Sequence, residues 1–111
     1  MIPNIEKWKT QIRRVYLELC ILLVIQSKKK TYGFEILEVL KDNDLEVKEG
    51  TLYPLLNRMA QEGTLSSHWI TENNTGHPRK FYALTPHGEK NLEEMKLEFH
   101  RVHKTYKQLN A

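Results

Sequence analysis

Residues 51–86 read TLYPLLNRMAQEGTLSSHWITENNTGHPRKFYALTP. The first part of this stretch has apolar residues at i, i+3, i+4 and i+7, the spacing of one helix face. They are Leu52, Leu55, Leu56 and Met59. With Thr51 as the N-cap, Pro54 would be the third helical residue, where a missing N–H costs little. An earlier start near Glu49 would require an irregular first turn. Gly63 then suits a left-handed helix end.

Two strands follow this helix, Leu65–Thr71 and Arg79–Leu84. The residues between them are rich in Asn, Thr and Gly, which is turn chemistry. The pattern predicts a β-hairpin whose loop is too long for a tight two-residue turn. We therefore expect the loop to project as a flap, with Arg79 and Lys80 on its return limb.

Two helices are predicted before this stretch. Ile5–Gln26 contains no Gly or Pro, and its second half is apolar nearly all round, so that half should be buried. Cys20 there is best explained as a small core residue. A second helix should run from Thr31, its N-cap, to about Lys41. Gly33 in its first turn indicates close packing against another element.

A long last helix is predicted from Thr85, an N-cap followed by proline, to Leu109. Its apolar residues step by 3, 4, 3, 4 and 3, which is the spacing of a helix–helix seam. They are Leu92, Met95, Phe99, Val102, Tyr106 and Leu109. We favour a homodimer interface over packing back on the same chain, because Trp8 and Ile12 on the first helix also need a partner surface.

The order helix, helix, helix, strand, flap, strand, long helix predicts an α+β, mostly helical fold: a winged helix-turn-helix with a long C-terminal dimerisation helix. We expect residues 1–84 to form the DNA-binding domain, with the first helix also in the dimer interface, and residues 85–111 to form the dimerisation helix. The third helix would enter the major groove of double-stranded DNA. The wing cations, and three lysines before the second helix, would flank it.

Composition fits a single domain of this kind. The 111 residues include 17 Lys and Arg against 14 Asp and Glu, a net charge of +3 that permits a nucleic-acid partner without requiring one. A single cysteine excludes an internal disulfide. With no secretory pattern and no membrane-spanning apolar run, we expect a cytoplasmic protein with no membrane partner.

Four segments together resemble the PadR family of bacterial transcriptional regulators. They are Tyr32–Ile36, Glu49–Leu56, Glu62–Gly63 and Gly76–Thr85. The resemblance covers roughly residues 10–105, and the short length is similar to the subfamily that includes multidrug-responsive repressors. It implies a winged-helix homodimer that binds a palindromic operator and mostly represses transcription.

The resemblance also implies which residues contact DNA, in the recognition helix, the wing and the start of the second helix. They are Tyr32, Thr51, Tyr53, Asn57, Arg58, Gly76, Arg79 and Lys80. Lys48 departs from the small capping residue of many relatives and adds a phosphate contact. Phe99 aligns with the tryptophan that stacks on flat ligands in multidrug-responsive members. It implies, with Trp8, a site for a small aromatic effector at the dimer interface.

Other functions are less well supported. No nucleophile–base pair or phosphate-binding loop indicates an enzyme, and no cofactor is expected. His100 and His103 are spaced to share a metal but have no obvious third ligand, so we expect no metal site. A winged-helix module that binds protein is one alternative, although the third helix lacks an exposed apolar face. A ligand-binding helical dimer, with a secondary DNA role, is another.

Overall fold

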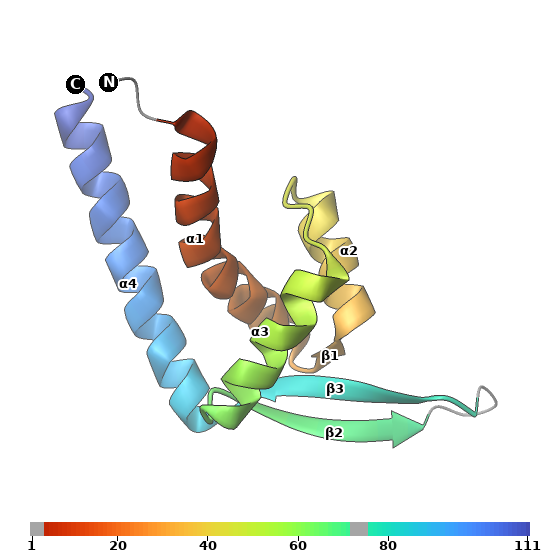
Figure 1. Cartoon of the computed structure of the whole chain (residues 1–111). Coiled ribbons are helices and arrows are strands. Elements are labelled where there is room, and N and C mark those ends of the chain that lie inside the picture. Colours follow the sequence, from red (N-terminus) through yellow and green to blue (C-terminus); the bar gives the residue numbers. More distant parts are fainter. Residues whose placement is uncertain (1–3, 72–75) are drawn as a thin grey trace.

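The computed structural model describes residues 4–71 and 76–111. Within those residues the chain forms four helices and a small antiparallel sheet of three strands (Figure 1), which confirms the predicted fold class. In chain order the elements are α1 (Ile5–Lys28), β1 (Thr31–Tyr32), α2 (Gly33–Asp42), α3 (Glu49–Gln61), β2 (Leu65–Thr71), β3 (Pro78–Leu84) and α4 (Pro86–Leu109).

The start of α1 is capped by Asn4, whose Oδ1 accepts hydrogen bonds from the backbone N–H groups of Glu6 and Lys7. The helix continues two residues past the predicted end, to Lys28. Its apolar second half is buried as expected, and Ile21 and Ile25 have no exposed surface. This half of α1 forms the centre of the core.

The prediction that Thr31 caps α2 is wrong. Thr31 lies in β1, where it pairs with Tyr82, and its hydroxyl donates to Oε1 of Glu35 at 2.5 Å. Tyr32 is the N-cap and makes no side-chain capping bond. The backbone at residues 31–32 is therefore used to extend the sheet, and this tertiary pairing outweighs the local preference of threonine for a cap.

The third helix also begins earlier than predicted, at Glu49 instead of after Thr51, and Lys48 is its N-cap. The Lys48 carbonyl accepts from the N–H of Thr51 at 2.9 Å and of Leu52 at 3.0 Å, so the first turn is irregular but hydrogen-bonded. Pro54 consequently lies inside the helix. The carbonyl that it deprives of a donor belongs to Gly50, which is exposed, so water can supply the missing bond.

The predicted hairpin is confirmed, with β3 starting one residue earlier, at Pro78. The strands pair in register from Leu65↔Leu84 to Thr71↔Pro78, and β3 is the central strand between β1 and β2. Most of the predicted flap, residues 72–75, lies outside the described residues. The hairpin extends away from the helices (Figure 1), as a wing should.

The first turn of α4 is fixed against the turn that follows α3. As predicted, the Thr85 hydroxyl caps the helix by accepting from the N–H of Gly88. The same residue donates from its N–H to the Thr64 carbonyl at 3.1 Å and from its hydroxyl to the Gly63 carbonyl at 2.6 Å. A Cβ at residue 88 would overlap the Thr64 carbonyl oxygen. Only glycine permits this approach of helix to backbone.

We therefore predict that Gly88→Ala destabilises the fold by about 1–3 kcal/mol, because backbone atoms cannot yield as a side chain would. Gly50→Ala is the matched control, since a Cβ at residue 50 meets nothing within 4 Å. It should stabilise by about 0.5–1 kcal/mol, because alanine restricts the unfolded chain. Urea denaturation followed by circular dichroism measures both, and equal effects of the two substitutions would contradict the contact.

Candidate nucleic-acid interface

The two sides of α3 have different environments. Leu52, Leu56 and Met59 are buried in the core, whereas Asn57 and Gln61 are exposed one turn apart. Asn57 thus has its amide available to a partner, as the sequence predicts for a base-reading side chain. Tyr53 is 40% exposed and lies toward the wing side of the helix.

The ring of Tyr53 lies directly over the first residue of α2. A Cβ built on Gly33 would be 2.5 Å from Cε1 and 2.6 Å from the hydroxyl oxygen of Tyr53. This is the close packing that a glycine in the first helical turn predicts. The absence of a side chain at residue 33 therefore positions an aromatic ring of the recognition helix beside the start of α2.

The cations of the wing lie against aromatic rings. The Arg79 guanidinium is 4.6 Å from the ring centre of Tyr32, and the Lys80 ammonium is 5.9 Å from that of Trp69, its cross-strand neighbour. Lys80 is also 5.7 Å from the ring centre of Tyr82. The attraction of a cation to an aromatic face restricts these long side chains.

These residues surround one shallow hollow of about 320 Å³. Its lining comes from β1, α2, α3 and the two wing strands: Tyr32, Gly33, Phe34, Tyr53, Trp69, Pro78, Arg79 and Lys80. Four of the predicted DNA contacts, from three separate parts of the chain, are thereby brought together. Phe34 and Trp69 are additions that sequence reasoning missed, and both are more than half exposed. An aromatic residue exposed beside a predicted wing cation is the signal that could have identified Trp69.

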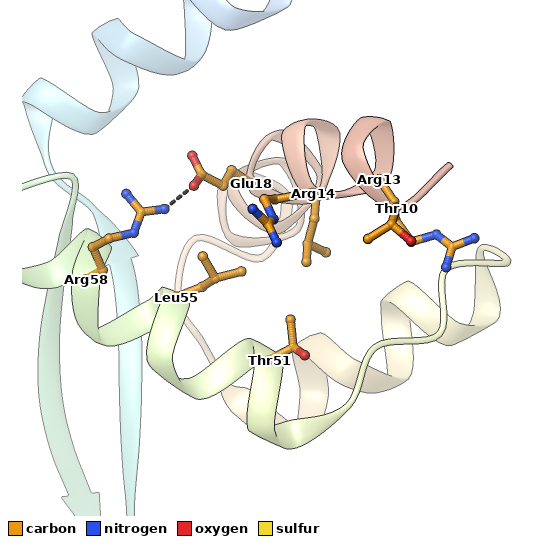
Figure 2. A pocket seen from close by; sticks show the side chains of 8 residues that line it. Thr10, Arg13, Arg14, Glu18, Thr51, Leu55 and Arg58 are labelled. Carbon is orange, nitrogen blue, oxygen red and sulfur yellow. Dashed lines mark hydrogen bonds and ion pairs between the residues drawn. The ribbon is translucent and has the colours of Figure 1, made fainter. Parts of the chain in front are cut away.

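The remaining predicted contacts lie elsewhere. Thr51 and Arg58 face α1 across a second cavity, where Arg58 is paired with Glu18 (Figure 2). Arg58 is also paired, at 2.9 Å, with Glu62 one turn along α3. The neighbouring Glu18 carboxylate raises the pKa of Arg58. Lys48 is exposed at the start of α3. Gly76, at the described edge of the wing loop, has a φ of 68° that suits glycine.

The predicted interface residues divide into buried and exposed groups. Leu92 has no exposed surface, so the prediction that it contacts a partner is wrong: it packs in the chain's own core, and Met95 packs partly against that core. The other predicted members are about half exposed or more: Trp8, Ile12, Phe99, Val102, Tyr106 and Leu109. Ile5 and Val15, missed by the sequence analysis, are also exposed and extend the spacing of Trp8 and Ile12 to 3, 4 and 3.

Comparison with known proteins identifies the family. The sequence profile of the transcriptional regulator PadR-like family matches residues 21–94. The chain belongs to the PadR-like family. It is 39% identical to a PadR-like transcription factor from Bacteroides fragilis, with a TM-score of 0.78 and coverage of 93% of this chain and 98% of that one.

Two other PadR-like structures are similar. A PadR family transcription regulator from Clostridium difficile R20291 is 32% identical over 86% of this chain and 99% of that chain, with a TM-score of 0.78. One from Bacillus cereus is 35% identical over 89% and 95%, with a TM-score of 0.76. Comparison with curated proteins gives no match. Membership identifies this PadR-like chain as a DNA-binding winged-helix regulator of transcription.

Two further features of this PadR-like chain concern residues 4–71 and 76–111. No group of three or more His, Cys, Asp or Glu side chains there is placed to hold a metal ion. None of the helices in the same ranges is long and apolar enough to cross a membrane.

Cys20 is half-buried on α1, and burial raises the pKa of its thiol, which makes the reactive thiolate less accessible at neutral pH.

We predict that Gly33→Ala displaces the ring of Tyr53 in this PadR-like chain. The obstructing atoms belong to the tip of a side chain that can rotate, so the cost in stability should stay below about 1 kcal/mol. Nuclear Overhauser contacts between residue 33 and the Tyr53 ring report the position directly. They should disappear in Gly33→Ala and persist in Gly50→Ala, and their survival in both variants would show that the ring does not depend on the glycine.

Proposed function

We propose that this chain is a homodimeric transcriptional repressor of the cytoplasm that reads a palindromic operator with α3 and the wing. The observation that carries the proposal is the convergence of Tyr32, Tyr53, Arg79 and Lys80 around one hollow, with Asn57 exposed one turn after Tyr53 on α3. Neutral hydrogen-bonding groups on a helix and cations on a hairpin are the two kinds of group that a winged helix needs.

In this proposal the residues of the recognition helix specify sequence and those of the wing fix position. Asn57 can pair with adenine through two hydrogen bonds in the major groove. Arg79 and Lys80 meet phosphates, as cations on protein surfaces more often do. Lys48, exposed at the start of α3, and Gly76, in the wing loop, would add further backbone contacts. Thr51 and Arg58 would do so from the side of α3 that faces α1.

The dimer is proposed from the unpartnered apolar residues of α1 and α4. Phe99, Val102 and Tyr106 are 52%, 55% and 60% exposed, and they follow one another at seam spacing. Leu97 is the exposed apolar residue of α4 that lies off this spacing. Because monomeric proteins rarely expose a continuous apolar stripe of this kind, a second copy is the simplest cover. Residues 85–111 then serve dimerisation, while residues 1–84 read DNA and contribute α1 to the interface.

A flat aromatic effector at this interface is a further part of the proposal. Phe99 lines a hollow of about 330 Å³ between α1 and α4, together with apolar side chains of α1. Trp8 is exposed on the same helix, nearer its start. An effector that stacked on these rings would alter the separation of the two copies and so relieve repression.

Selection of bound fragments from the source genome tests the function, because it returns the operator and its neighbouring gene together. A dimer should protect two half-sites about 34–36 Å apart, one helical turn. Footprinting of a single, unpaired half-site would contradict the palindrome.

Two substitutions test the division of DNA contacts. Asn57→Ala should weaken operator binding more than binding to scrambled duplex, by about 1–3 kcal/mol of lost discrimination. Lys80→Ala should weaken both about equally and lower the slope of log affinity against log salt by about one unit. Fluorescence anisotropy across a salt series measures both. The reverse pattern would exchange the roles of helix and wing.

A charge in the seam tests the dimer. Phe99→Asp should convert the dimer to monomer at micromolar concentration, because a carboxylate buried without a partner costs several kcal/mol. Arg101→Asp, on the polar side of the same helix, is the control and should leave the sedimentation coefficient unchanged. A wild-type chain that sediments as a monomer under these conditions would refute the dimer itself.

A further inference from the structure

A cavity of about 480 Å³ lies between α1 and the recognition helix, apart from the wing hollow (Figure 2). Its lining residues are Thr10, Arg13, Arg14, Leu17, Glu18, Thr51, Leu55 and Arg58. At 100° per residue, the α1 members fall on the opposite side of that helix from Trp8, Ile12 and Val15. The cavity is therefore separate from the proposed dimer seam and its effector site.

The cavity combines an apolar floor with a cationic rim. Leu17 is only 5% exposed, and Leu55 packs partly against the core. Three guanidinium groups border this floor, two from α1 and one from α3. In Figure 2 the side chain of Arg14 points from α1 toward α3, whereas that of Arg13 extends along the rim toward the loop before α3.

Some charged side chains in this cavity have a partner of opposite charge and others do not. Glu18 is the one carboxylate in the lining, and it already pairs with Arg58, which also pairs with Glu62. Among the residues that the structure describes, the side chains of Arg13 and Arg14 form no hydrogen bond or ion pair. Two positive charges beside the buried Leu17 and the half-buried Leu55 thus have no counter-charge of their own.

We propose that this cavity binds a small amphipathic organic anion, in which a carboxylate or phosphate group is carried on an apolar body. Its acid group would take charge-assisted hydrogen bonds from Arg14, and its apolar part would cover Leu17 and Leu55. Arg13 would add positive charge at the rim. The volume lies within the range of about 300–1,000 Å³ typical of small-molecule sites. A DNA phosphate fits less well, because it would leave the apolar floor uncovered and meet the Glu18 carboxylate.

Because Glu18 is paired with Arg58, binding of an anion in the cavity would affect α3. A bound anion repels the Glu18 carboxylate and competes for Arg58, so it weakens the tie between α1 and the recognition helix. This regulatory step rests on the proposed DNA-binding function. The binding step does not, and it can be measured on the full chain without DNA.

The probes are 1-naphthoate and 1-naphthamide, which have the same ring and nearly the same shape but differ in charge. Naphthoate should bind the wild-type chain, as followed by amide chemical-shift changes in α1 and α3, and naphthamide should bind at least about tenfold more weakly. Arg14→Gln should weaken naphthoate binding at least about tenfold and leave naphthamide unaffected. Arg101→Gln, on α4 and outside the cavity, should change neither.

Glu18→Gln supplies a test of opposite sign. Removal of the only carboxylate in the lining should tighten naphthoate binding by about three- to tenfold, whereas a merely structural role for Glu18 would weaken it or leave it unchanged. Equal binding of naphthoate and naphthamide would overturn the proposal, as would shift changes confined to α4. So would an Arg14→Gln chain that binds naphthoate normally but loses affinity for random duplex, because Arg14 would then be a DNA-phosphate contact. Loss of DNA binding in every chain, with naphthoate binding intact, would refute only the proposed function.

Discussion

Thr85 and Gly88 hold the first turn of α4 against the backbone at Gly63 and Thr64, where α3 ends and β2 begins. This contact fixes the direction in which the long helix leaves the winged domain (Figure 1). In a dimer built on α4, the same direction sets the distance between the two recognition helices, and therefore the spacing of the half-sites that they can read. The Thr85 hydroxyl and the missing side chain of Gly88 thus determine how the proposed DNA-binding surface is oriented relative to the proposed dimer surface.

A glycine is also required for close packing at residue 33, the start of α2. Gly33 admits the ring of Tyr53, and Tyr32 beside it supports Arg79. The start of α2 is consequently one point at which the recognition helix and the wing meet. Because Tyr32 also pairs with Phe81 in the sheet, Tyr32 and Gly33 form one route by which a change in wing position would reach the recognition helix.

The sequence predicts the elements well where a local pattern coincides with a tertiary one. The hairpin, the Thr85 cap and the close packing at Gly33 are of this kind. The sequence prediction fails at Thr31 and Thr51, which are both good capping residues. The backbone of Thr31 pairs in the sheet instead, and Thr51 lies inside a helix that starts two residues earlier. A two-residue strand has no periodicity to detect. Nothing in the seam spacing distinguishes Leu92 from Phe99, because burial depends on how close α4 remains to α1 along its length.

The candidate site is likewise predicted only in part by the sequence. The resemblance implies Arg58 and Asn57 as neighbouring contacts on one helix, but their surroundings differ: Arg58 is paired with two carboxylates, while Asn57 is exposed. Arg58, the cation of the recognition helix, is therefore already paired with carboxylates of its own chain, and the cations held on aromatic faces belong to the wing. Such an arrangement leaves neutral, directional groups on the helix and non-directional charge beside it. In the proposed function, this arrangement lets a chain with a net charge of only +3 combine attraction for phosphate with selection among bases, because each task would fall to a different element.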